Sequence, residues 1–112
     1  MLNRCALVVR PKQPFLDWAA SLDDSGLVPD PADEQTVYLI PNFESDVEAE
    51  RILKKVFAEV FERELDGWHT DETAWPKNRS LATFKQWFHV ELHSIVEDLC
   101  AYEITDDEAY PR

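Results

Sequence analysis

Two short apolar runs have the length and composition of β-strands. Residues 4–10 read RCALVVR before Pro11, and residues 36–40 read TVYLI before Pro41. Both runs are rich in β-branched and aliphatic side chains, and each is closed by a proline, which cannot donate to a sheet ladder. The pattern predicts a strand at each position.

Two other stretches repeat their apolar residues every three or four positions, as amphipathic helices do. The shorter begins near Pro14 and stops at DDSG, residues 23–26. The longer begins after Ser45, which has capping-box spacing to Glu48, and runs to Gly67, a residue that favours the position just past a helix end. Its apolar stripe is made of Ala49, Ile52, Leu53, Val56, Phe57, Val60, Phe61 and Leu65.

The apolar period that follows Ser80 is ambiguous. A helix capped by Ser80 fits the apolar positions of the next two turns, and the same spacing can be continued to residue 99 as one long helix. Phe88, Val90 and Leu92 instead alternate as a strand, which is favoured because two strands need a further partner to form a stable sheet. Residues 100–104 alternate again and are a candidate for one more short strand.

These elements predict a two-layer α/β sandwich, with a small mixed sheet of three or four strands and two or three helices on one face. Residues 1–105 form a single α/β domain, and residues 106–112 form a frayed acidic tail. A right-handed crossover through the first helix makes the first two strands parallel neighbours. One sheet face then turns away from the helices, and we expect it to carry Ala6, Val8, Tyr38, Ile40, His89, Glu91 and His93.

Composition and charge narrow the classes of partner. The chain of 112 residues has 45% apolar residues and a formal net charge of -12, from 11 Lys and Arg against 23 Asp and Glu. Such a charge repels nucleic-acid phosphate and anionic membranes, so neither is expected as a partner. Cys5 and Cys100 have no metal or redox spacing and are expected to be reduced thiols. The apolar run near the start is too short for a signal peptide, which predicts a cytoplasmic protein.

His89 and His93 are candidate metal ligands, with Glu91 between them. On a strand the two histidines share a face but lie far apart, whereas on a helix they have the spacing that can hold one zinc ion. The alternative is a partly exposed sheet face on which His and Glu pair loosely. No cofactor is predicted.

A second candidate is an anion pocket. If the strands are parallel, their carboxyl ends meet at one edge, where Arg10 and Lys12 would join Asn42 and Ser45 beside two helix starts. The absence of a Gly-rich loop and the two prolines around Lys12 weaken a phosphate cradle. The alternative is a solvated turn.

The third candidate is a protein interface. An apolar sheet face on a chain this small marks a contact surface, most simply for a homodimer, unless the C-terminal segment covers it. The irregular loop at 68–79 carries two tryptophans that either contact a partner or anchor the loop to the core. The expected interface residues are Tyr38, Ile40, Trp68, Trp75, His89 and His93. No catalytic residues can be named, so an enzyme is disfavoured without being excluded.

Three segments, NRCALVVRPKQPFLDW, ELDGWHTDETAWP and FHVELHSIVEDL, together resemble a family of short, acidic bacterial proteins of unknown function. The resemblance covers nearly the whole chain. It implies a bacterial, cytoplasmic, single-domain protein and supports a strand for the last segment, but it brings no activity and no site residues. The sequence thus favours a non-enzymatic protein that binds a protein partner or itself, and the alternative is an anion-binding or metal-binding domain.

Overall fold

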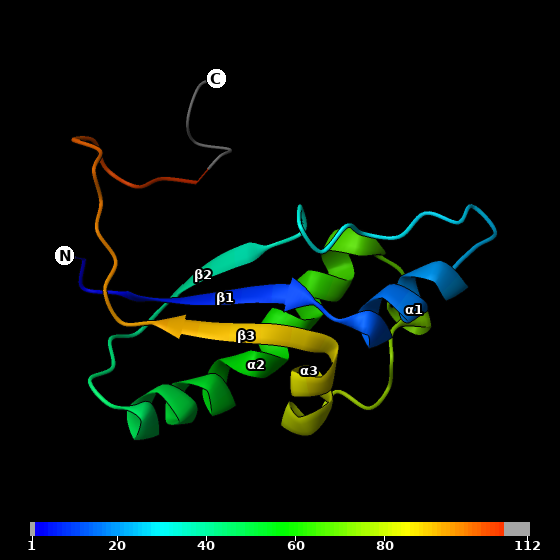
Figure 1. Ribbon diagram of the computed structural model, residues 1–112, viewed down its shortest axis with the longest axis horizontal. Helices are drawn as coiled ribbons and strands as arrows, with labels where there is room; N and C mark the ends of the chain where they lie inside the picture. The colour runs from blue at the N-terminus through cyan, green and yellow to red at the C-terminus, as the bar shows by residue number, and fades with distance from the viewer. Residues whose placement is uncertain (1, 107–112) are drawn as a thin grey trace.

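The computed structural model describes residues 2–106, and Figure 1 shows the order of its elements. The strands are β1 (Cys5–Pro11), β2 (Thr36–Ile40) and β3 (Phe88–His93), and the helices are α1 (Gln13–Ser21), α2 (Asp46–Trp68) and α3 (Leu81–Trp87), with a 3-10 turn at Glu72–Ala74. The two-layer α/β fold predicted from the sequence is confirmed. The predicted frayed tail lies outside the described residues, apart from Asp106.

The sheet has the strand order β2-β1-β3, and both pairings are antiparallel. The predicted parallel pairing of β1 with β2, and with it the mixed sheet, is therefore wrong. Helix α1 does not carry the chain across the sheet, because the connector of residues 22–35 returns it to the end where β1 stops. The Val9–Thr36 pair lies at that end, and the Cys5–Ile40 pair lies at the other.

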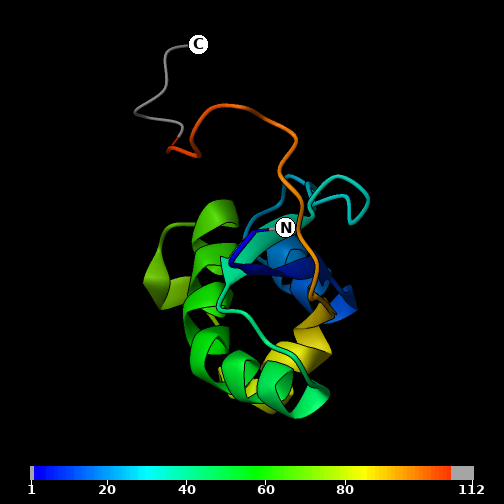
Figure 2. The ribbon, with the colours of Figure 1, turned by 90° about the vertical axis from the view of Figure 1, so that its left-hand side faces the viewer.

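The core fills the space between the sheet and the helices, which Figure 2 shows on one side of the strands. Phe61 of α2 is at its centre, and its ring centroid lies 5.7 Å from that of Phe84, 5.7 Å from that of Trp87 and 5.4 Å from that of Phe88. Rings at these separations and tilted angles add to the free energy that burial supplies. The interlocked rings fix how α2, α3 and β3 sit together.

The ambiguous stretch resolves into a helix followed at once by a strand. Helix α3 ends at Trp87 and β3 begins at Phe88, so the predicted short helix and strand are confirmed over one long helix. The predicted fourth strand is wrong, since residues 94–106 are neither helix nor strand. Two hydrogen bonds join the beginning of this segment to the start of the chain: the Cys5 thiol donates to the Ser94 carbonyl at 3.4 Å, and the Leu2 N–H donates to the Val96 carbonyl at 2.8 Å.

Helix α2 starts as predicted, with the Ser45 hydroxyl accepting a hydrogen bond from the Glu48 N–H at 3.2 Å. Its end differs by two residues, because Gly67 lies in the last helical turn and the His69 N–H donates to the Leu65 carbonyl at 2.8 Å. The two additional residues make Trp68 part of the helix, and Trp68 lines a cavity together with Phe15 of α1 that is described below.

Candidate functional site

The sheet face turned away from the helices carries a different part of β2 from the one predicted. Val37 and Leu39 are 61% and 46% exposed on it, whereas Tyr38 and Ile40 face the helices and Ile40 is buried. The cause is the antiparallel register, which pairs Leu7 with Tyr38 and so puts both on the buried face. Tyr38 and Ile40 therefore do not lie on the exposed sheet face predicted for them, and Val37 and Leu39 lie there instead.

We call this surface the open face, and it consists of Ala6, Val8, Arg10, Val37, Leu39, His89, Glu91 and His93. Its polar half is organised around Glu91. The carboxylate lies 3.1 Å from His93 Nε2, 3.4 Å from His89 Nε2 and 3.6 Å from an Arg10 nitrogen. The hydrogen bond with His93, followed by the positive charge of Arg10, lowers the pKa of Glu91. Three basic side chains thus surround one acid in a strongly acidic protein.

The two histidines converge on Glu91 from either side along β3. Among residues 2–106, no group of three or more His, Cys, Asp or Glu side chains is placed to hold a metal ion. Metal binding by the His89 and His93 pair stays a prediction. It would require Glu91 to give up its contacts with the two histidines and to bind the same ion as they do.

Two tryptophans, Trp75 and Trp18, hold the loop between α2 and α3 in place. Trp75 is buried, and its indole N–H donates to the His69 carbonyl at 2.8 Å while the Arg79 guanidinium lies over its ring. Trp18 of α1 holds the same loop by donating to the Ala74 carbonyl at 2.9 Å. Trp75 therefore anchors the loop to the core, which was the alternative to a partner contact, while Trp68 is partly buried.

The four residues of the predicted anion pocket do not meet. Arg10 and Lys12 lie at the end of β1, whereas Asn42 lies beside Cys5 at its start, with 3.8 Å between Asn42 Oδ1 and Cys5 Sγ. Ser45 follows Asn42 and serves as the cap of α2. A shared edge required parallel strands, and the antiparallel pairing separates the two pairs.

Arg10 and Lys12 instead share a hollow with a residue of β3. The hollow, of about 440 Å³, is lined by Arg10, Pro11, Lys12, Pro31, Ala32, Gln35 and His89. Lys12 is partly engaged, since its Nζ donates to the Lys85 carbonyl at 2.9 Å. The cations predicted for an anion site thus do come together, but with His89 and without Asn42 and Ser45.

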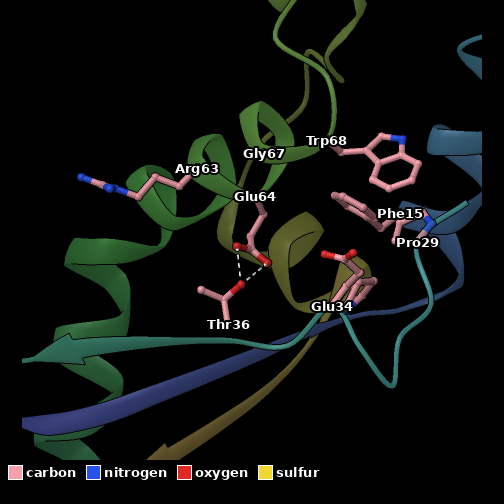
Figure 3. Close-up of a pocket in the computed structure, with 9 residues that line it drawn as sticks. Phe15, Pro29, Glu34, Thr36, Arg63, Glu64, Gly67 and Trp68 are labelled. Carbon is pink, nitrogen blue, oxygen red and sulfur yellow. Dashed lines mark hydrogen bonds between the residues drawn. The ribbon is translucent and has the colours of Figure 1, made fainter. Parts of the chain in front are cut away.

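Sequence reasoning missed a second cavity, on the other side of the sheet, which Figure 3 shows in close-up. It measures about 110 Å³ and lies between α1, the second half of α2 and the start of β2. Its lining residues are Pro11, Phe15, Pro29, Glu34, Thr36, Arg63, Glu64, Gly67 and Trp68. Glu64 lies next to the apolar stripe of α2, and nothing in the periodicity separates it from the solvated acids of that helix.

The carboxylate of Glu64 accepts hydrogen bonds from two hydroxyl groups of β2. Tyr38 donates to it at 2.6 Å and Thr36 at 3.0 Å. Burial raises the pKa of Glu64, and the negative charge of Glu34 raises it further, although the two hydroxyls act in the opposite direction. Burial and the hydrogen bond to Glu64 also raise the pKa of Tyr38. Glu64 is thus a half-buried carboxylate whose pKa is raised above the usual value for a glutamate.

Comparison with known proteins gives no assignment, because no family model, no curated protein and no solved structure matches the chain. The resemblance to acidic bacterial proteins therefore stays a prediction. Within residues 2–106, no helix combines the length and apolarity that a membrane span requires.

Proposed function

We propose that this is a self-associating protein-interaction domain of the bacterial cytoplasm, without catalytic activity, and that its open face binds a second copy of the chain. The observation that carries the proposal is the exposure of Val37 and Leu39 on the sheet face turned away from the helices, where they lie beside the half-buried Val8 and the buried Ala6. Contiguous apolar surface of this kind marks contact sites in small proteins. A two-fold contact would let both copies use the same surface.

The segment after β3 is the part of the second copy that would lie on the open face. Leu99 is 98% exposed, and Ile95 and Ile104 are also exposed, so apolar side chains of this segment find no cover in their own chain. Figure 1 shows the segment passing the start of β1 and leaving the sheet. A second copy that lays residues 95–104 over the open face would bury both apolar surfaces at once.

The charges of the two surfaces are complementary. The segment carries Glu97, Asp98 and Glu103, whereas the open face carries Arg10, His89 and His93 with the single acid Glu91. Because the whole chain has a net charge of -12, most of its other surfaces would repel an acidic segment. The open face is thus the surface best suited to accept it.

Sedimentation velocity at several protein concentrations tests the proposal. The wild-type chain is expected to sediment as a dimer, and Val37→Lys is expected to sediment as a monomer because it places a charge in the contact. Val47→Lys is the matched control, since Val47 is exposed to a similar extent, at 69% against 61% for Val37, but lies on α2. Leu99→Lys should weaken the dimer like Val37→Lys. A wild-type monomer at the highest concentration, or equal effects of Val37→Lys and Val47→Lys, contradicts the proposal.

A second candidate function is binding of a small anion in the hollow of Arg10, Lys12 and His89. The observation that favours it is the gathering of three basic side chains around one concavity. A ligand that binds only the folded state raises the melting temperature, so phosphate, a carboxylate panel and zinc are the probes. If none of them stabilises the protein more than sodium chloride at equal ionic strength does, ligand binding at this hollow is ruled out.

A further inference from the structure

The cavity beside Glu64 has the chemistry of a cation site. We propose that it binds a primary ammonium group at the end of an alkyl chain, with the Glu64 carboxylate as the anionic partner. This site lies on the helix side of the sheet and is independent of the association proposed for the open face.

The first argument is an unbalanced charge. Glu64 is half-buried, yet within residues 2–106 it forms no ion pair with any Lys, Arg or His, and its polar contacts are the hydroxyls of Tyr38 and Thr36. The neighbouring residue Arg63 directs its guanidinium away from the cavity in Figure 3 and pairs with Glu59 at 3.4 Å. A half-buried carboxylate without a cation is costly, and an ammonium group would neutralise it.

The second argument is the hydrogen-bonding capacity that remains on this carboxylate. Its Oε2 atom accepts from Tyr38 and Thr36, whereas Oε1 receives only a 3.3 Å contact from the same Thr36 hydroxyl. A carboxylate has about four lone-pair positions, so acceptor sites are left for the N–H groups of a ligand. The two hydroxyls hold the carboxylate in place, and their hydrogen bonds to it can remain when a ligand binds.

The third argument is the shape and lining of the cavity. Figure 3 shows the Glu34 carboxylate pointing towards the same space as Glu64, with the rings of Trp68 and Phe15 on one side. Aromatic faces attract cations and cover methylene groups, and Pro29 adds a further apolar wall. About 110 Å³ is well below the size of a drug-like pocket, so the cavity suits the tip of a ligand and not a planar cofactor.

The ammonium group has two possible sources that share this chemistry, a free alkylamine and a lysine side chain of a peptide. The probes are therefore n-butylammonium chloride and Nα-acetyl-lysine N-methylamide, and n-butanol serves as the neutral analogue of equal length. Titrations are followed by the backbone amide shifts of residues 63–68 and by the indole N–H signal of Trp68, at constant ionic strength. Saturable shifts with butylammonium, and none with butanol, are expected.

The comparison of the two amine probes separates the sources. Tighter binding of the blocked lysine indicates a peptide ligand that also contacts the rim, and tighter binding of butylammonium indicates a free amine. Either result supports the site. Equal shifts with butylammonium and butanol would show that only the apolar walls matter, and the proposal would then fail.

Two variants and one titration link binding to Glu64. Glu64→Gln removes the charge and is expected to weaken butylammonium binding by about tenfold or more, the size of a lost charged hydrogen bond. Asp66→Asn is the matched control, because it makes the same charge change on an exposed position of the same helix that does not line the cavity. Equal affinities of the two variants would overturn the proposal.

The titration uses the wild-type chain, so it does not depend on how Glu64→Gln folds. Carboxyl-carbon chemical shifts of Glu64 report its pKa directly. Saturating butylammonium should lower that pKa, because a bound cation favours the ionised form. An unchanged pKa of Glu64 at a concentration that saturates the amide shifts would place the amine elsewhere.

Discussion

The two faces of the sheet differ in how far the chain itself covers them. On the helix side, Leu7 and Val9 are fully buried beneath the interlocked rings of α2, α3 and β3. On the open face, the neighbouring strand β2 exposes Val37 and Leu39, and β3 contributes the polar cluster centred on Glu91. The chain satisfies one face by its own packing and leaves the other apolar and accessible. Stability and association should therefore respond to different residues.

The largest effect is expected at the centre of the helix side. Phe61→Ala removes a ring that contacts Phe84, Trp87 and Phe88, and it should lower the free energy of unfolding by about 3–5 kcal/mol. Urea unfolding followed by tryptophan fluorescence measures this loss. A loss below about 1 kcal/mol would mean that the ring cluster does not hold the layers together.

Adjacent residues of β2 give the sharpest contrast between the faces. Ile40→Ala should cost about 2–5 kcal/mol because Ile40 is buried, whereas Leu39→Ala should change stability by about 0.5 kcal/mol or less. Both variants remove aliphatic carbon from one strand, so each controls for the other. The opposite ranking in urea unfolding would mean that the register of β2 is shifted by one residue.

A smaller effect should appear in the pH dependence of stability. Because the pKa of Glu64 is raised in the folded state, its contribution to stability is greatest at low pH and is lost as the pH rises from the unfolded value through the folded one. The free energy of unfolding of wild type relative to Glu64→Gln should thus fall as the pH rises above about 4, the ordinary pKa of a glutamate side chain.

The exposed acids Asp23 and Asp71 have lowered pKa values, so their contribution to stability changes with pH in the opposite direction. Both proteins contain these acids, and taking the difference between them at each pH cancels that contribution. Tyr38→Phe tests the same contact from β2 and should raise the pKa of Glu64 further, because it removes a hydrogen bond to the ionised form. A relative stability that rises with pH would contradict the assignment.

The smallest effect is expected in the polar cluster of the open face. Glu91→Gln keeps the shape of the side chain, and its partners His89, His93 and Arg10 are well solvated, so the urea midpoint should not change within error. A clear loss of stability would show that this cluster supports the fold, and it would then be a poor candidate for a partner surface.

The sequence predicted the elements well because each carried a local signal. The Ser45 cap, the stripe of α2 and the alternation of Phe88, Val90 and Leu92 depend on neighbours along the chain, and all are found in the structure. The direction in which β2 pairs with β1 depends instead on the end of the sheet to which the connector of residues 22–35 returns the chain. No local pattern in the connector predicts which end that is.

Two separate errors misplaced the candidate site. The wrong register parity of β2 exchanged the faces of Val37 and Leu39 with those of Tyr38 and Ile40. The wrong pairing direction predicted that Arg10 and Asn42 lie at the same edge of the sheet, whereas they lie at opposite ends of β1. His89 and His93 were placed correctly because their strand parity is fixed by Phe88, which must enter the core. The Glu64 cavity could not be predicted, since it forms from three segments far apart in the sequence, residues 11–15, 29–36 and 63–68, that come together only in the tertiary fold.

The position of β1 at the centre of the sheet has a consequence for folding. Its outer partner β3 emerges from the ribosome long after it, and Ser94, which accepts a hydrogen bond from Cys5, lies 89 positions further along the chain. Such long-range pairing slows folding, because the entropy cost of closing a large loop comes before the contacts between the strands can stabilise the pair. During synthesis, α2 is complete while β1 still lacks a neighbour on that side. The apolar strand at the start of the chain is therefore the segment that most needs protection from aggregation until translation of β3 is finished.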